Sequence, residues 1–141
     1  MTGYRVSDVM TKQVVYLSAE TTLDEAARVM QEADIGDVVV TDGASLAGML
    51  TDRDIVVRAV AERSDPASTT IGSIVTREVV MIEQHSTAGE AASLMRERGV
   101  RRILVCDNER KLVGIVSLGD LAMHLDPNSA LSDISEQAPT R

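Results

Sequence analysis

Apolar and polar positions along this chain follow a pattern that predicts short strands alternating with amphipathic helices. The first predicted helix carries an apolar stripe at the spacing i, i+3, i+4, i+7, formed by Leu23, Ala26, Ala27 and Met30. An uninterrupted apolar run follows at 38–40, and such runs are typical of strands buried on both faces. Asp42-Gly43 then indicates a turn before the next apolar segment.

The same pattern occurs a second time about 65 residues further along the chain. At this offset identical residues meet, including Thr11 with Thr76, Thr22 with Thr87, Met30 with Met95 and Asp42 with Asp107. One extra residue near Lys111 moves the offset to about 66, after which Gly48 meets Gly114 and Asp54 meets Asp120. A single gap in so long a match indicates a duplicated structural unit.

Each copy is expected to contain the same elements in the same order. A strand over 14–17 or 79–82 precedes a helix whose first turn has the form of a capping box, Thr22 with Glu25 or Thr87 with Glu90. The buried strands at 38–40 and 103–105 are followed by strands over 46–50 and 112–116. A second helix, over 54–62 or 120–125, ends each copy.

This order predicts the fold class α/β, of the α+β kind, with two pseudo-symmetric βαββα repeats packed through their sheets. One small sheet with two helices leaves a sheet face uncovered, so the two copies are expected to cover each other. The predicted boundaries are repeat 1 at 6–63, a linker at 64–70, repeat 2 at 71–125 and a mobile polar C-terminal tail at 126–141.

Composition narrows the classes of function. The net charge of −8 and an aromatic set limited to Tyr4 and Tyr16 argue against nucleic acid, which needs cationic surfaces and stacking platforms. No apolar run approaches the ~20 residues that span a bilayer, and the N-terminus lacks the apolar stretch of a signal peptide. The single cysteine, Cys106, fits a reducing compartment, so we expect a cytoplasmic protein without membrane contact.

Two segments at equivalent places share the pattern G-h-h-[ST]-x-x-D, where h is apolar. They are Gly48-Met-Leu-Thr-Asp-Arg-Asp54 and Gly114-Ile-Val-Ser-Leu-Gly-Asp120. In these segments, and in Val9-Met10-Thr11 and Ile74-Val75-Thr76, the chain resembles the cystathionine-β-synthase (CBS) domain family. The resemblance covers about residues 6–125 and implies a tandem CBS pair, a stand-alone Bateman-type module that regulates and does not catalyse.

The resemblance also implies a ligand. CBS pairs take AMP, ADP, ATP or, less commonly, S-adenosylmethionine in clefts between the two repeats, so an adenine nucleotide is the expected regulatory ligand. No cofactor and no metal are expected to be required. An aspartate in the first helical turn can accept hydrogen bonds from ribose hydroxyls, and a hydroxyl residue beside helix N–H groups suits phosphate.

Carried over residue by residue, the resemblance implies two sites. The first combines Thr51 and Asp54 with Thr76, Val79, Val80, Arg101 and Arg102. The second combines Ser117 and Asp120 with Thr11, Val14, Val15, Gly36 and Asp37. Because Arg101 and Arg102 attract phosphate whereas Asp37 repels it, the Asp54 site is the expected binder if only one site binds.

Several of these residues also have simpler interpretations. Thr51-x-x-Asp54 and Ser117-x-x-Asp120 could be helix N-caps alone, and Arg101-Arg102 could be a solvated pair at a helix end. Asp52-Arg53-Asp54 could bind a divalent metal, although a charged helix start is the simpler account. Cys106 is expected in the core, and the isolated His85 and His124 do not have zinc-site spacing.

Partners and rival functions follow from the same pattern. CBS proteins commonly dimerise through their helices, and the second helix of repeat 1 has spare apolar residues (Ile55, Val56, Val57, Ala59 and Val60), so a homodimer that signals to an unknown effector protein is expected. The main rival is a structural or interaction protein, for example a stress-linked one, with degenerate ligand sites. Val39 and Leu104 favour it, because many CBS proteins have proline there. A small nucleotide-directed enzyme is a third interpretation, but the chain shows neither a nucleophile–base pair nor a Walker loop.

Overall fold

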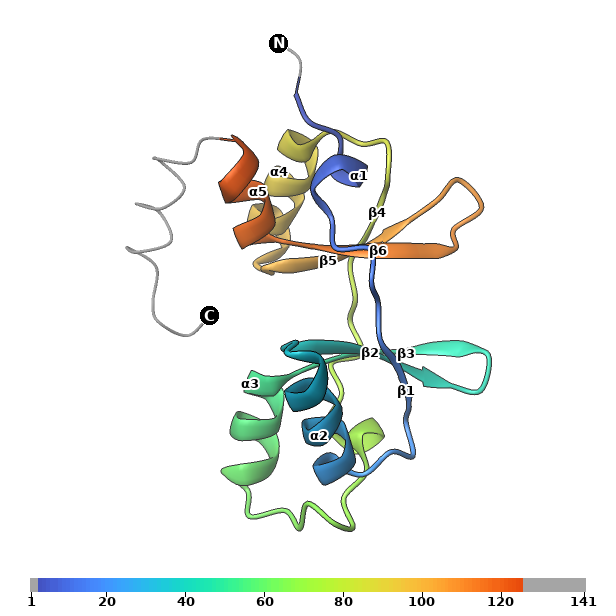
Figure 1. The fold of residues 1–141 in the computed structure, drawn as a ribbon, viewed down its shortest axis with the longest axis vertical. Helices are drawn as coiled ribbons and strands as arrows, with labels where there is room; N and C mark the ends of the chain where they lie inside the picture. Colours follow the sequence, from blue (N-terminus) through green and yellow to red (C-terminus); the bar gives the residue numbers. More distant parts are fainter. Residues whose placement is uncertain (1–2, 126–141) are drawn as a thin grey trace. The chain divides into compact units, whose positions relative to one another are not determined.

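The computed structural model describes residues 3–125, which form two compact units, each built on one three-stranded sheet (Figure 1). The first-repeat unit comprises residues 15–79. The second-repeat unit comprises residues 3–14 together with 80–125. The segment predicted as a mobile tail, 126–141, lies outside the described residues.

The first-repeat unit contains one parallel and one antiparallel strand pair. Its elements are β1 (Tyr16–Ser18), α2 (Leu23–Ala33), β2 (Asp37–Asp42), β3 (Ser45–Thr51), α3 (Asp52–Asp54), η1 (Ile55–Val60) and η2 (Ile71–Ser73). Strand β2 lies in the middle of the sheet, parallel to β1 and antiparallel to β3. A parallel pair needs a crossover connection, and α2 supplies it.

The second-repeat unit has the same plan. Its elements are α1 (Val6–Val9), β4 (Met81–Glu83), α4 (Ala88–Arg98), β5 (Arg102–Cys106), β6 (Leu112–Ser117) and α5 (Leu118–Leu125). Strand β5 lies in the middle, parallel to β4 and antiparallel to β6. Both hairpins also carry a register shift at equivalent places, after Val40 and after Val105. The predicted mixed α/β class and the duplication are therefore confirmed.

In each unit the helices cover one face of the sheet (Figure 1). Val38, Val40 and Leu50 are fully buried on that face of the first-repeat sheet, where they pack with Leu23 and Met30 of α2. An equivalent cluster forms in the other unit from Ile103, Val105, Val116, Ala88, Ala91 and Met95. The apolar stripe predicted from helical spacing supplies these contacts, except that Ala27 is exposed.

Each unit is completed by the first residues of the other repeat, 6–11 or 71–76, which we call the leading segments. Val6 and Val9 of α1 lie in the core of the second-repeat unit, and Thr11 exchanges two backbone hydrogen bonds with Ile115 of β6. In the same way Ile71 lies in the core of the first-repeat unit, and Thr76 exchanges two hydrogen bonds with Met49 of β3. The compact units and the sequence repeats therefore divide the chain at different places.

Gly48 and Gly114 permit this pairing of the leading segments with β3 and β6. A Cβ atom on Gly48 would lie 2.2 Å from the carbonyl oxygen of Thr76, and the φ of Gly48 is +155°. A Cβ atom on Gly114 would lie 2.7 Å from the carbonyl oxygen of Thr11. The glycine that opens the G-h-h-[ST]-x-x-D pattern thus leaves space for a neighbouring backbone.

The two predicted capping boxes at the first helices have different outcomes. The box of Thr87 and Glu90 is confirmed, and hydrogen bonds from the Thr87 backbone N–H and hydroxyl hold the pKa of the Glu90 carboxyl below its usual value. The box of Thr22 and Glu25 is wrong. The Thr22 hydroxyl donates to the nearer carboxylate of Asp24, which lowers the pKa of Asp24.

The second helix of repeat 1 differs from the single helix predicted over 54–62. After one turn of α3 the chain continues as a wider helix with i→i+5 bonds, such as Ala61 N–H to the Val56 carbonyl and Ser64 N–H to the Ala59 carbonyl. Three consecutive β-branched residues, 55–57, lower the preference of this segment for an α-helix. Within residues 3–125 no helix has the length and apolar content needed to cross a membrane.

Candidate functional site

The two G-h-h-[ST]-x-x-D segments form the same local structure at the start of the second helix of each repeat. The backbone N–H of Asp54 donates to the Thr51 hydroxyl, and the backbone N–H of Thr51 donates to Oδ2 of Asp54, both at 3.0 Å. Ser117 and Asp120 make the equivalent bonds at 3.1 and 2.9 Å. Each pair therefore caps the start of its helix, which is compatible with capping alone and with capping plus ligand binding.

The capping hydrogen bonds occupy only one of the two oxygens of each aspartate carboxylate. The cap occupies Oδ2 of Asp54 and Oδ2 of Asp120, whereas an ionised carboxylate accepts about four hydrogen bonds through its two oxygens. Both aspartates are only partly exposed. Each side chain is therefore held in one orientation by the cap and keeps acceptor capacity for a further donor.

The strand that contains each buried run, β2 or β5, begins beside the capping box of its own unit. Asp37 is the register partner of Thr51, and the N–H of Asp52 donates to the carbonyl of Gly36 at 2.9 Å. In the second-repeat unit Arg102 is the register partner of Ser117. There the N–H of Leu118 donates to the carbonyl of Arg101 at 2.8 Å.

Strand periodicity gives the face on which these side chains lie. The neighbouring pair Val38 and Leu50 belongs to the core beneath the helices, so Asp37 and Thr51 point to the opposite face of the sheet. The pair Ile103 and Val116 gives the same result for Arg102 and Ser117. The helix-free face of each sheet thus ends in a hydroxyl residue opposite a charged residue, an acid in one unit and a base in the other.

The leading segments place the predicted threonines and valines close to these caps. Thr76 pairs with Met49, two residues before Thr51, and Thr11 pairs with Ile115, two residues before Ser117. Val15 accepts a hydrogen bond from Val39, and Val80 accepts one from Leu104, so both valines extend a strand next to the buried run. Val14 and Val79 are the half-buried residues just before them.

The predicted site residues are therefore divided between the units as follows. The first-repeat unit contains Thr51, Asp54, Thr76, Val79, Val15, Gly36 and Asp37, and the second-repeat unit contains Ser117, Asp120, Thr11, Val14, Val80, Arg101 and Arg102. Thr76 shares a unit with Asp54, and Thr11 shares one with Asp120. The ligand roles of all these residues stay predictions. The combinations of Val80, Arg101 and Arg102 with Asp54, and of Val15, Gly36 and Asp37 with Asp120, join residues of different units.

Arg58 is a residue near the first cap that the sequence interpretation missed. Its Nη2 lies 3.8 Å from Oδ1 of Asp54, and its Nη1 donates to the carbonyl of Ile74 at 2.9 Å. The Arg58 side chain is 45% exposed, so this ion pair adds little stability but places a cation beside the carboxylate. The i, i+4 spacing of Asp54 and Arg58 was the available signal. His124 occupies the equivalent position in repeat 2, and its Nδ1 contacts the backbone oxygen of Asp120.

Cys106 and His85 lie apart from the caps, whereas His124 contacts the backbone of Asp120. Cys106 is a free thiol buried in β5, as predicted. The ring of His124 makes an edge contact with Tyr4, whereas His85 lies in the turn before α4. Across the part of the chain that the structure describes, no three His, Cys, Asp or Glu side chains gather in the way a metal site requires.

Two grooves lie on the helical sides of the units, away from the predicted site residues. One, of about 570 Å³, lies between α2 and η1 and is lined by Leu23, Ala27, Ile55 and Val60 among others. The second, of about 690 Å³, is wider open and follows α4 from Thr87 to Glu97. Neither groove is lined by a residue predicted to bind ligand, so their volumes do not bear on the nucleotide hypothesis.

Comparison with known proteins agrees with this geometry. The sequence profile of the CBS domain matches the chain twice, over residues 6–60 and 71–127. These two matches cover most of the chain. The chain is therefore a member of the CBS domain family and contains two CBS repeats.

Individual relatives support the same conclusion. The CBS domain-containing protein YhcV of Bacillus subtilis is 38% identical over 136 residues, which span 94% of this chain and 96% of YhcV. A crystal structure of Hypoxic Response Protein I with two coordinated zinc ions is 36% identical, with a TM-score of 0.71, and the match covers 89% of this chain and all of that one. A CBS domain pair solved with 5′-methylthioadenosine and S-adenosyl-L-methionine is 24% identical with a TM-score of 0.74, over 96% of this chain and 100% of that chain, and shows a shared fold.

Proposed function

We propose that this protein is a regulatory module that binds an adenosine-containing ligand, with AMP, ADP and ATP as the first candidates and S-adenosylmethionine as the next. The observation that carries the proposal is the pair of equivalent caps, in which Asp54 and Asp120 are held at the start of a helix with acceptor capacity left over. Ribose hydroxyls are donors of the required kind. A related CBS pair was solved with two adenosine compounds, which supports this ligand class.

The module is proposed to act without catalysis. Binding would shift the chain between conformations, and the ligand can do so only as far as its affinity for those conformations differs. The output would then pass to an effector protein or through self-association. We propose a cytoplasmic location, because a single buried cysteine, Cys106, fits a reducing compartment.

The ribose assignment can be tested with Asp54→Asn and Asp120→Asn, each measured by calorimetry with AMP, ADP, ATP and S-adenosylmethionine. If a carboxylate binds ribose, its variant should weaken binding by about 1.5–3 kcal/mol, since hydrogen bonds to charged groups are of this strength. The matched control is Glu90→Gln, which alters the capping box of α4, away from the predicted site residues. It should change stability but leave affinity unaltered.

If Asp54→Asn and Asp120→Asn lose only stability, as the control does, the carboxylates are caps and the ribose assignment is wrong. Absence of binding of all four ligands by the unaltered protein would favour the second candidate, a CBS-fold interaction protein with degenerate sites. Two observations support that candidate. Oδ1 of Asp54 already faces Arg58, and Val39 and Leu104 stand where many CBS proteins have proline.

We also propose that the protein forms a homodimer through its second helices. Val56, Val57 and Val60 of η1 are 58%, 47% and 62% exposed, which is unusual for three valines so close together in the chain. Ile55 and Ala59 of the same segment face inward and belong to the core or its edge. An apolar helical surface of this kind is stable in water when a partner covers it.

The dimer proposal predicts that Val60→Glu shifts the protein toward monomer, because a carboxylate would be buried against apolar side chains. We expect the dimer dissociation constant to rise at least about tenfold, a change of ~1.4 kcal/mol, measured by analytical ultracentrifugation. Leu46→Glu, at another exposed apolar residue, is the matched control and should leave the dimer intact. Equal effects of the two variants would place the interface elsewhere.

A further inference from the structure

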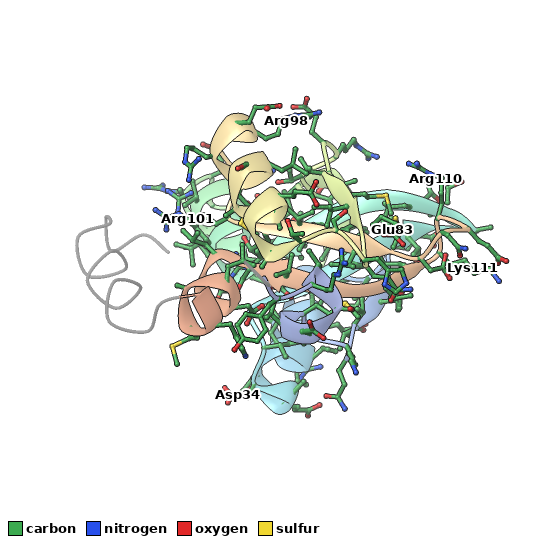
Figure 2. All side chains as sticks on the ribbon, turned by 90° about the horizontal axis from the view of Figure 1, so that it is seen from above. Asp34, Glu83, Arg98, Arg101, Arg110 and Lys111 are labelled. Atoms are coloured by element: carbon green, nitrogen blue, oxygen red, sulfur yellow. The ribbon has the colours of Figure 1, made fainter. Side chains whose placement is uncertain are left out.

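Asp54 of the first cap (Thr51 with Asp54) differs from the exposed charged residues of this chain, because its carboxylate is held inside its own unit. Asp34 and Lys111, for comparison, are exposed and lie at the periphery in Figure 2. The side chain of Asp54 is only 14% exposed, and its Oδ2 accepts the N–H of Thr51. Water therefore screens the charge of Asp54 less than it screens the surface charges, so a charged group beside it has a larger effect.

Arg58 places a cation beside this carboxylate and is held there by a second contact. Its Nη2 lies 3.8 Å from Oδ1 of Asp54, which is too long for a hydrogen bond. Its Nη1 donates to the carbonyl of Ile74 at 2.9 Å. Because Ile74 belongs to the leading segment 71–76, the guanidinium joins η1 to that segment. Arg58 thus offsets the charge of Asp54 without using the acceptor capacity of Oδ1.

The caps of the two units have an arginine near them at different positions. Strand β2 places Asp37 beside the first cap, and Arg58 of η1 supplies an arginine there. Strand β5 places Arg102 beside the second cap, that of Asp120, where the position equivalent to Arg58 is His124. The Nδ1 of His124 contacts the backbone oxygen of Asp120. An arginine in the second helix therefore occurs in the unit whose strand supplies an acid.

Helix stability by itself gives little reason for Arg58. The Arg58 side chain is 45% exposed, and ion pairs of exposed side chains contribute little to stability. A ligand that carries phosphate gives a stronger reason. If Asp54 accepts a ribose hydroxyl, a phosphate on the same ribose lies within the ~10 Å over which charges act in 0.1 M salt. The carboxylate of Asp54 would repel this phosphate, and the cation of Arg58 offsets the repulsion.

We propose that Arg58 sets the charge of the ligand, so that the first cap binds an anionic adenosine compound, such as AMP, ADP or ATP, in preference to the cationic S-adenosylmethionine. This inference rests on the proposed function and adds the residue that selects among its ligands. Arg58 acts through the carboxylate that it faces. No contact between the guanidinium and the ligand is required, because the effect is one of charge.

Two pairs of ligands measure this effect, because the members of each pair share adenine and ribose but differ in charge. AMP differs from adenosine by its phosphate. S-adenosylmethionine differs from S-adenosylhomocysteine by the methyl group that makes its sulfur cationic. The reference protein is the full chain with Asp120→Asn, which weakens the second proposed site. Calorimetry should show that this reference prefers AMP to adenosine, and S-adenosylhomocysteine to S-adenosylmethionine.

Arg58→Gln, added to the reference, should lower the preference for AMP over adenosine about tenfold, because the carboxylate is then no longer offset. The affinity for S-adenosylmethionine relative to S-adenosylhomocysteine should rise about threefold or more. Arg58→Lys keeps the positive charge and should keep both ratios within about threefold of the reference. The matched control is Arg28→Gln, the same change of charge at an exposed residue of α2 on the helical side of the unit, which should leave both ratios unaltered.

A role of Arg58 in stability alone would change the affinities for both members of a pair by the same factor. If Arg58→Gln weakens AMP and adenosine equally, this inference is wrong although the proposed function stands. If the unaltered protein binds none of the four compounds, the proposed function is wrong and the selection by Arg58 with it. Salt gives an independent readout, since in 1 M salt the screening length falls to about 3 Å and the preference of the reference for AMP should shrink.

Discussion

Gly48→Ala is expected to destabilise the first-repeat unit by about 3 kcal/mol or more. Two effects act together. The new Cβ atom would lie 2.2 Å from the Thr76 carbonyl oxygen and 2.9 Å from its carbon, and both are backbone atoms that cannot rotate away. The φ of +155° is also one that residues with a side chain rarely adopt. The result would be loss of the hydrogen bonds between Met49 and Thr76.

Urea unfolding followed by circular dichroism measures this effect. Gly89→Ala is the matched control, because the nearest atom to a Cβ at that helical position is 3.9 Å away. Alanine should stabilise α4 there by about 0.5–1 kcal/mol. If Gly48→Ala unfolds at the same urea concentration as the unaltered protein, the close approach of the two backbones is not required for the fold.

Ile71→Ala is expected to lower the free energy of unfolding by about 2–5 kcal/mol, and its effect should appear in the first-repeat unit. Ile71 begins the second repeat in the sequence, yet its side chain is fully buried in the cluster that contains Leu23 and Leu50. The substitution leaves a cavity in that cluster. Amide exchange should therefore accelerate in β2 and β3 and stay unchanged in β5 and β6.

Ile103→Ala is the converse variant, because Ile103 is fully buried in the cluster of the second-repeat unit. Its effect on amide exchange should be confined to β5, β6 and their helices. Loss of protection in β5 and β6 on substitution of Ile71 would contradict the exchange of leading segments between the two repeats.

Sequence patterns predicted the elements that depend on neighbouring residues. The spacing of Leu23, Ala26 and Met30 identified α2 and its buried face, and the apolar runs at 38–40 and 103–105 identified the central strands. The capping box of Thr87 was also recognisable, since its hydrogen bonds close within four residues. These features depend on residues close together in the chain, whose local preferences agree with the whole fold.

Features that depend on competition between neighbouring groups were harder to predict. Thr22-x-x-Glu25 has the form of a capping box, but Asp24 lies closer in the chain. Its carboxylate accepts the hydrogen bond of the Thr22 hydroxyl. The wider helical turns of η1 could not be predicted from the apolar positions, because the same spacing fits an ordinary α-helix. The contact of Arg58 with Asp54 had a recognisable spacing but competes with solvent and with the Ile74 carbonyl.

By itself the sequence determined the duplication, the mixed α/β class and the two caps, because each of these follows from residues close together or from a repeated pattern. Only the tertiary structure decided which leading segment completes which unit, since β3 and β6 can in principle pair with either one. It also decided which charged residue faces each cap within a unit, Asp37 opposite Thr51 and Arg102 opposite Ser117. Those pairings depend on strand register, and register is set by the burial of whole sheet faces and not by any one residue.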